Sequence, residues 1–450
     1  MIAIDKKEKI VFLLAGAFVI IKLAMTAYPH EAGWDESVYA GMGKYIFSGG
    51  ETGLWEIIRP FGLPLLLGAV WKAGLAPLGW EVLAIMFAAG NILLTFYLAR
   101  KIFNDSTGLF AALLMAGSTV LFSQSHLLMT ELPSTFFMLL ALNLWAREKK
   151  AYASGLAAAA VMFKFPHLLL GAVFAGYIAV NNRKPKAIAK KMLEAWPYAA
   201  IMMLFLAVNY AAYSQDAFDF NAALRPLLMA EEHKSNPAES VEGALKNIFF
   251  YPISFAGQNP FFLLAIPGMY YASKNRRAQA LAIILISYLA YFTIIINKQE
   301  RFGLLFMPIA AVFAGHGMYR LLISGIGTSK RGIAVTAIIF FIAGIASYSI
   351  IHEDYSRINE RMNMQGAYYE SYGTVLSSNP YPAYYTSDKV LHYYFSSADN
   401  REWIEKAVQT AEENSGAQII YNESDFYCND DYCRTQHEKL KSILGKNESS

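Results

Sequence analysis

Residues 10–28 read IVFLLAGAFVIIKLAMTAY, and residues 33–39 read GWDESVY. The first stretch is apolar except for Lys22, and its length suits a helix that crosses about 30 Å of hydrocarbon. It lacks the small-residue cleavage pattern of a removed signal peptide, so we interpret it as a retained anchor. Asp35 and Glu36 then lie at the exit of the span, where ionisable side chains are costly unless they serve a function. This acidic pair marks a candidate functional site at one membrane face.

The composition indicates a polytopic membrane protein. Hydrophobic residues make up 55% of the chain and charged residues 16%, with a mean hydropathy of +0.30, outside the usual balance of a soluble globular protein. The small net charge of +3 gives no reason to expect a nucleic-acid partner. Apolar segments long enough to suggest about eleven transmembrane helices recur at residues 10–28, 80–99, 107–125, 133–146, 151–163, 166–181, 195–213, 259–273, 278–297, 302–324 and 332–351.

Basic clusters occur at alternate connections between these segments, starting with Lys6, Lys7 and Lys9 before the first span. By the positive-inside rule these connections, and the N-terminus, are cytoplasmic. The opposite connections are then extracytoplasmic: a first outer loop at 29–79, a second at 214–258, and everything after residue 351. Residues 61–75 are apolar but short and interrupted by proline, so we expect a helix that lies in the outer membrane interface.

These features predict two domains. Residues 1–351 form an all-α transmembrane catalytic domain, and residues 352–450 form a small soluble extracytoplasmic domain of α/β or α+β type. The second domain is polar and rich in tyrosine, with a strand pattern at 417–424 and a helical pattern at 401–414. Cys428 and Cys433 are the two cysteines of the chain. Their spacing favours a small disulfide loop over a metal site, because no further ligands lie nearby in sequence.

Three carboxylates are candidates for catalysis. Asp35 and Glu36 are adjacent, so on a helix they point about 100° apart and one can act while the other orients or binds. The alternative is that both cap a short helix over residues 36–47. Glu131, in the sequence HLLMTELP at 126–133, lies in a turn predicted to share the face of Asp35. It can hydrogen-bond an acceptor, or cap the helix that Pro133 begins.

Three cations lie at the predicted outer edge of the bilayer, where the orientation rule does not place positive charge. They are Arg59, Lys164 and Arg301. Each alone is typical of a side chain that extends toward water, whereas three beside an acidic pair indicate a phosphate-binding site. His126, His167 and His233 are weaker candidates. No His or Cys spacing supports a metal site, so we interpret them as polar contacts; the sequence indicates no cofactor, and it leaves a divalent cation open without indicating one.

The order of these motifs resembles the GT-C superfamily of integral-membrane glycosyltransferases, in the branch of protein O-mannosyltransferases and lipid A aminoarabinose transferases. The resemblance covers most of residues 10–325. It rests on Asp-Glu-x-x-Tyr at 35–39, Arg-Pro at 59–60, the segments at 98–103 and 130–133, Phe-Lys-Phe-Pro at 163–166, and the run from Lys298 through Pro308. Two departures stand out, because many relatives carry Asp in place of Glu131 and Thr in place of Phe163.

The resemblance implies sugar transfer from a polyprenyl- or dolichyl-phosphate donor to a protein, lipid or glycan acceptor on the outer face, with inversion. Asp35 would be the general base, with Glu36 beside it, and Glu131 would orient the acceptor or assist the base. The phosphate would be held by Arg59, Lys164 and Arg301. The other expected donor-site residues are Tyr39, His126, Arg225 and His233.

Three other functions remain open. An oligosaccharyltransferase-like enzyme would need a divalent cation held by several carboxylates, and the tail has no Trp-Trp-Asp signature. A transporter or flippase would place polar residues at mid-span and show pseudo-symmetric halves, whereas here the polar residues gather at one predicted face. In a non-catalytic scaffold, Asp35 would be dispensable.

Overall fold

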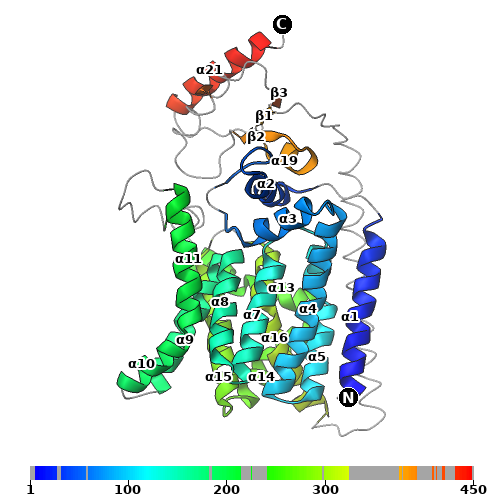
Figure 1. The fold of residues 1–450 in the computed structure, drawn as a ribbon. Helices are drawn as coiled ribbons and strands as arrows, with labels where there is room; N and C mark the ends of the chain where they lie inside the picture. The colour runs from blue at the N-terminus through cyan, green and yellow to red at the C-terminus, as the bar shows by residue number, and fades with distance from the viewer. Residues whose placement is uncertain are drawn as a thin grey trace. The chain divides into compact units, whose positions relative to one another are not determined.

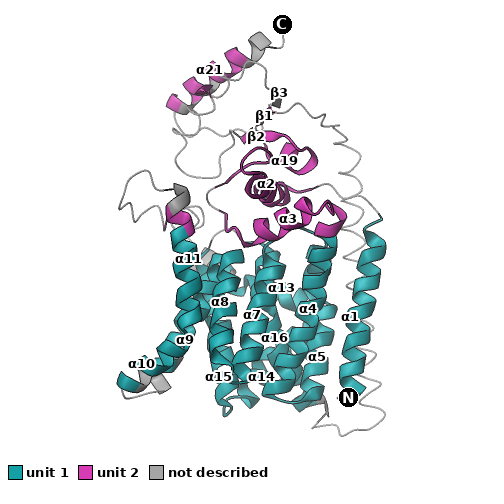
Figure 2. Cartoon of the chain, viewed as in Figure 1, with its two compact units in different colours: residues 1–29, 81–207, 234–361 teal, residues 30–80, 208–233, 362–450 magenta. Residues whose placement is uncertain are grey.

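The computed structural model describes residues 6–27, 32–56, 59–181, 185–213, 224, 241–295, 298–323, 374–377, 379–392, 408–409, 412, 418–420 and 431–447. The chain divides into two compact units (Figure 2). We call residues 1–29, 81–207 and 234–361 the bundle unit, and residues 30–80, 208–233 and 362–450 the mixed unit.

The bundle unit is built of helices that run roughly alongside one another (Figure 1). Its elements are α1 (Lys6–Met25), α4 (Leu78–Ile102), α5 (Asp105–Ala116), α6 (Thr119–Gln124), α7 (Glu131–Ala146), α8 (Lys150–Phe163), η1 (Phe165–His167), α9 (Leu168–Asn181), α10 (Pro185–Glu194), α11 (Trp196–Tyr213), α13 (Val241–Gln258), η2 (Pro260–Leu264), α14 (Ala265–Tyr271), α15 (Arg276–Ile294), η3 (Glu300–Leu305), α16 (Met307–Met318) and η4 (Tyr319–Ile323). Helices α4 and α11 each begin or end with a few residues assigned to the mixed unit.

Helix α16 lies at the centre of the bundle unit and is buried along its whole length. It packs against α5 and α14. Glycines allow the closest of these contacts: a Cβ atom on Gly268 would lie 1.9 Å from the carbonyl oxygen of Phe313, and one on Gly317 would lie 2.2 Å from that of Leu264. Small residues at such crossings let helix backbones approach closely, which is how helices associate where no water drives them together.

The helical segments match the sequence prediction in position more than in length. Among the described residues, α4 and α15 are the helices long and apolar enough to cross a membrane by length and composition, so the prediction of about eleven spans is not confirmed. The segment at 107–125 is divided into α5 and α6, because Gly117 ends the first helix and the Ser118 side chain caps the second. The segment at 332–351 lies outside the described residues.

The second predicted outer loop differs from the structure at its C-terminal end. We expected residues 214–258 to be a loop, but residues 241–258 form α13, an 18-residue helix that packs against α15 and η2. Its sequence mixes Lys246 and an internal Pro252 with aromatic residues. That mixture hides a helix from a hydropathy scan, because a charged residue and a proline lower the average over the window.

The mixed unit contains α2 (Trp34–Ser48), α3 (Gly62–Lys72), β1 (Thr374–Ser377), α19 (Tyr381–Tyr385), β2 (Lys389–His392), β3 (Gln418–Ile420) and α21 (Asp431–Asn447). The three strands form a parallel sheet in the order β2-β1-β3, in which Val375 pairs with Val390 on one side and with Gln418 on the other. Strand β3 lies within the strand predicted at 417–424. The helix predicted at 401–414 lies almost wholly outside the described residues, as does Cys428 of the expected disulfide.

The grouping of segments in the mixed unit differs from the predicted domains. The sequence analysis assigned residues 29–79 to the transmembrane domain, whereas the structure groups residues 30–80 with the C-terminal segment. Within this unit α3, which coincides with the expected interfacial helix, packs tightly on α2: a Cβ atom on Gly43 would lie 2.7 Å from the backbone nitrogen of Gly68. The physical reason for the grouping is hydrogen bonding between segments far apart in sequence, which no local pattern reveals.

Candidate functional site

The N-terminal turn of α2 separates the two adjacent acids. Gly33 is the N-cap, and its backbone N–H donates a 2.8 Å hydrogen bond to Oε2 of Glu36. Glu36 is 2% exposed, so its carboxylate serves the start of its own helix. The Asp35 side chain points elsewhere and keeps 21% of its surface exposed. The two adjacent carboxylates therefore have different surroundings, and the N-cap is Gly33 rather than Asp35.

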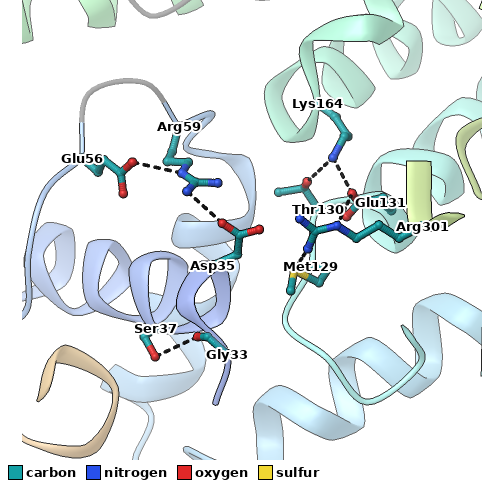
Figure 3. A network of polar contacts seen from close by, with 10 residues as sticks. All are labelled: Gly33, Asp35, Ser37, Glu56, Arg59, Met129, Thr130, Glu131, Lys164 and Arg301. Carbon is teal, nitrogen blue, oxygen red and sulfur yellow. Dashed lines mark hydrogen bonds and ion pairs between the residues drawn. The ribbon is translucent and has the colours of Figure 1, made fainter. Parts of the chain in front are cut away.

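Asp35 belongs to an acidic cluster that we define as Asp35, Glu56 and Arg59 (Figure 3). The Arg59 guanidinium contacts Oδ1 of Asp35 at 2.8 Å through one terminal nitrogen and Oε1 of Glu56 at 3.3 Å through Nε. The guanidinium also lies 5.4 Å from the centre of the Tyr39 ring, a cation–π contact. Two carboxylates and one cation leave the acidic cluster with a net charge of −1.

The protonation state of Arg59 follows from these neighbours. Burial acts to lower its pKa, but Glu56, Tyr39 and Asp35 together outweigh burial and hold the pKa well above its ordinary value. Arg59 is therefore a permanent cation whose charge is shared between two carboxylates. Such a guanidinium orients the carboxylates that it binds, because its donors lie in a fixed plane.

The bundle unit contains a basic cluster, which we define as Glu131, Lys164 and Arg301 (Figure 3). Nζ of Lys164 lies 2.5 Å from Oε1 of Glu131, and Nε of Arg301 lies 3.7 Å from the same oxygen. Glu131 is 1% exposed, whereas the two cations keep 14% and 19% of their side-chain surfaces exposed. Among the described residues, none donates a hydrogen bond to the other oxygen of Glu131. Two cations and one carboxylate leave this cluster with a net charge of +1.

Three separate elements bring the basic cluster together. Glu131 is the first residue of α7, Lys164 is the extended residue between α8 and η1, and Arg301 lies in η3. Lys164 also donates to the Thr130 hydroxyl at 3.3 Å. The Phe302 ring underlies both cations, 4.7 Å from Lys164 Nζ and 5.6 Å from the Arg301 guanidinium carbon. The Phe302 ring thus contacts both cations, and each cation keeps part of its side-chain surface exposed.

The remaining predicted site residues have other partners or lie outside the described residues. Nδ1 of His126 is 3.1 Å from Nζ of Lys22, and Nδ1 of His167 is 2.5 Å from the Tyr288 hydroxyl. Both histidines therefore make polar contacts with side chains of the bundle unit. Arg225 and His233 lie outside the described residues. Within the part of the chain that the structure describes, no three His, Cys, Asp or Glu side chains gather as metal ligands would.

Among the buried charged residues that sequence reasoning did not select are Glu56 and Lys22. Glu56 is fully buried and binds Arg59, and the sequence contained a signal, because Glu56 precedes Arg59 by three residues. Lys22 is 1% exposed and also contacts the Phe122 ring at 4.2 Å. It was visible as the one charge within the first apolar stretch. Neither residue was selected as a site candidate, because neither belongs to a motif.

Residues 77–212 match the model of the family described as dolichyl-phosphate-mannose-protein mannosyltransferase. This segment contains Glu131 and Lys164 of the basic cluster. A search of curated protein sequences finds no significant match.

Solved structures with a similar fold belong to two kinds of enzyme. ArnT from Cupriavidus metallidurans bound to undecaprenyl phosphate aligns over 91% of this chain and 89% of its own, with 14% identity and a TM-score of 0.63. The same protein in the apo state aligns over 73% of this chain with 16% identity and a TM-score of 0.55, and the chain spans 62% of its length. AglB, the oligosaccharyltransferase of Archaeoglobus fulgidus, in complex with an inhibitory peptide and a dolichol-phosphate, aligns over 84% of this chain and 63% of its own, with 14% identity and a TM-score of 0.55.

These comparisons confirm the resemblance that the motifs indicated. The chain has the fold of GT-C glycosyltransferases. Within that class, one segment of the chain matches the mannosyltransferase family model, and the ArnT fold covers nine tenths of the chain.

Proposed function

We propose that this protein is a multi-pass membrane enzyme that transfers a sugar from a polyprenyl-phosphate donor to an acceptor hydroxyl on the extracytoplasmic face, with inversion at the anomeric carbon. The observation that carries the proposal is the opposite net charge of the two clusters, +1 on Glu131, Lys164 and Arg301 and −1 on Asp35, Glu56 and Arg59. A lipid-phosphate donor needs a site with surplus positive charge, and proton removal needs an available carboxylate. Similar folds that bind undecaprenyl phosphate and dolichol-phosphate support the donor class.

The basic cluster would hold the donor phosphate. Lys164 and Arg301 are partly exposed and share the Glu131 carboxylate, and the net charge of +1 on these three side chains favours binding of an anion. When the bond between the anomeric carbon and the phosphate oxygen breaks, negative charge grows on the leaving phosphate. Cations already in place stabilise that charge without reorganising, which is the largest source of catalysis in many enzymes. Glu131 is too buried to meet an acceptor easily, so we assign it to holding the two cations.

The acidic cluster would supply the base. Asp35 takes the proton of the acceptor hydroxyl while the hydroxyl oxygen attacks the anomeric carbon from the side opposite the phosphate. The new glycosidic bond forms as the bond to phosphate breaks, and the electron pair leaves with the polyprenyl phosphate. One displacement of this kind inverts the anomeric configuration. Because Arg59 already binds Asp35 and Glu56, we assign it to orienting Asp35 rather than to the phosphate role expected from sequence.

The test is a transfer assay on the purified full-length protein, with a panel of polyprenyl-phosphate monosaccharides and lipid-linked oligosaccharides. Wild type is compared with Asp35→Asn and with Lys72→Met, a control that changes an exposed lysine at the end of α3. We expect Asp35→Asn to release lipid phosphate about 10³-fold more slowly, the effect of removing a general base. Equal rates would overturn the assignment of Asp35, and a wild type that consumes no donor would overturn the donor class.

A further inference from the structure

A short C-terminal segment contacts the helix that carries Asp35. Helix α19 packs along α2 (Figure 1), and the two share a small buried core of Val38, Met42, Leu54, Ala383 and Val390. The helices approach so closely that a Cβ atom on Gly41 would lie 2.7 Å from Cβ of Ala383. We call residues 381–392, which comprise α19, the following turn and β2, the C-terminal clamp.

Lys44 joins the far end of α2 to the clamp. Its ammonium group donates 2.7 Å hydrogen bonds to the carbonyl oxygens of Tyr384 and Thr386, at the C-terminal end of α19. Lys44 is 4% exposed, and burial lowers its pKa against the opposing influence of the nearby Asp388 carboxylate, which is also buried. A buried ammonium is costly unless it is well bonded. The clamp supplies the two carbonyl oxygens that bond the Lys44 amine, so these hydrogen bonds join α2 to the clamp.

The clamp also binds the loop that carries the other half of the acidic cluster. The backbone N–H of Gly53 donates to the Asp388 carbonyl at 2.8 Å, and the N–H of Val390 donates to the Gly53 carbonyl at 2.8 Å. Gly53 thereby extends the edge of the sheet, with the φ of +78° that glycine adopts without strain. Three residues later the same loop reaches Glu56, which binds Arg59.

A third set of contacts lies at the start of α2. The backbone N–H of Ala32 donates to the Tyr385 hydroxyl at 3.0 Å. The rings of Trp34 and Tyr381 meet edge to face with their centres 6.1 Å apart. Trp34 directly precedes Asp35, so the clamp contacts α2 at both ends and at its middle.

We propose that the C-terminal clamp positions Asp35 against Arg59, and that Lys44 is the positioning residue that locks α2 to the clamp. Asp35 lies on α2 and Arg59 on the loop, and both elements are hydrogen-bonded to the same twelve residues of the clamp. Lys44 lies nine residues from Asp35, about 13 Å along the helix at 1.5 Å per residue, so it does not touch the reacting atoms. This inference rests on the proposed role of Asp35 and gives the C-terminal segment a function in that same site.

The test compares full-length wild type with Lys44→Met, Lys44→Arg and the exposed control Lys72→Met. Lys44→Met keeps the apolar stem and removes the donors, whereas Lys44→Arg keeps donors for both carbonyls. We expect Lys44→Met to lower kcat for sugar transfer about 10- to 100-fold at unchanged KM for the donor, because small misplacements of a catalytic group cost that much. Lys44→Arg should recover most of the rate, and Lys72→Met should match wild type.

Hydrogen–deuterium exchange supplies a readout that does not need activity. In Lys44→Met, peptides containing Gly53 and Val390 should exchange faster than in wild type, while peptides from α16 of the bundle unit stay equally protected. Unchanged exchange at Gly53 and Val390, or an unchanged kcat in Lys44→Met, would overturn the clamp. If wild type transfers no sugar, the proposed function fails, and the exchange comparison alone then decides whether the clamp holds α2 and the loop.

Discussion

The acidic and basic clusters contain the same kinds of side chains in opposite proportions. In the acidic cluster one guanidinium serves two carboxylates, and in the basic cluster one carboxylate serves two cations. Each cluster therefore keeps one charge that its own members do not balance. On these net charges we propose the acidic cluster for proton transfer and the basic cluster for binding of an anionic lipid.

The carboxylates of the two clusters also differ in burial. Asp35 keeps 21% of its side-chain surface exposed, whereas Glu131 keeps 1% and lies beneath its two cations. In each cluster the partly exposed groups are the ones that a substrate can reach. The comparison separates Glu131 from Asp35: the first is buried against two cations and the second is partly exposed, so we propose that the first holds cations and the second takes a proton.

After Asp35→Asn, removing a cation from the basic cluster gives the largest expected effect. Arg301→Gln should lower kcat/KM about 10²- to 10³-fold, the range seen when one preorganised donor to a developing negative charge is lost. Arg301→Lys should keep part of the rate because it keeps the charge. Kinetics with a polyprenyl-phosphate sugar and equilibrium binding of polyprenyl phosphate measure the two effects. Weaker binding in Asp35→Asn than in Arg301→Gln would reverse the roles that we assign to the clusters.

Glu131→Gln tests whether the buried carboxylate mainly holds its cations. Breaking a buried ion pair by removing one partner costs about 3 kcal/mol or more, so the free energy of unfolding should fall by about this amount. Added polyprenyl phosphate should raise Tm more in Glu131→Gln than in wild type, because the anion then balances two cations. Thermal unfolding with and without the lipid measures this difference. An unchanged Tm would show that Lys164 and Arg301 do not depend on Glu131.

Glu56→Gln tests the corresponding support in the acidic cluster. The change keeps the shape of Glu56 but removes the charge that fixes Arg59. We expect kcat to fall about 10-fold, since Asp35 is less well oriented while its carboxylate remains. Binding of polyprenyl phosphate should be unchanged. A loss of lipid binding in this variant would instead place Arg59 at the phosphate, as the sequence first suggested.

The smallest expected effect is a pH dependence from Lys44. Burial lowers its pKa from 10.5 to about 8, against the opposing influence of Asp388. Between these values the unfolded chain binds a proton that the native state has lost, so the free energy of unfolding rises as the pH increases from 8 toward 10.5. The gain is at most about 1.4 kcal/mol per pH unit and is absent in Lys44→Met. Chemical unfolding at pH 8 and pH 9 measures it; an equal pH dependence in the two proteins would contradict it.

Local patterns were enough to predict several parts of the molecule. The apolar run before Asp35 became α1, the interrupted run at 61–75 became α3, and the alternation at 417–424 contains β3. The motifs singled out Glu131 among the acids, and Lys164 and Arg301 together with Arg59 among the cations. These predictions depend on periodicity and residue type within a short window, which determine which face of an element is apolar and where a charge is unusual.

Other features depend on contacts between distant segments. The pairing of Arg59 with Asp35, and the burial of Glu56 and Lys44, follow from how loops and helices pack. Lys246 and Pro252 lower the mean hydropathy of the segment that forms α13, so the sequence analysis placed this segment in a loop. The segment at 107–125 was predicted as one continuous span, although α5 ends at Gly117 within it. A hydropathy window averages over such residues, whereas helix ends depend on individual caps.

The amino-acid sequence alone determined the membrane-like composition, the positions of most helices and the identity of the charged residues at the candidate site. It did so because hydrophobic periodicity and the cost of burying charge act locally along the chain. Which cation balances which carboxylate, and the attachment of α2 to the C-terminal clamp across some 340 residues, emerged only in the folded chain. Such pairings depend on distances of a few ångströms between groups far apart in sequence, and only packing sets those distances.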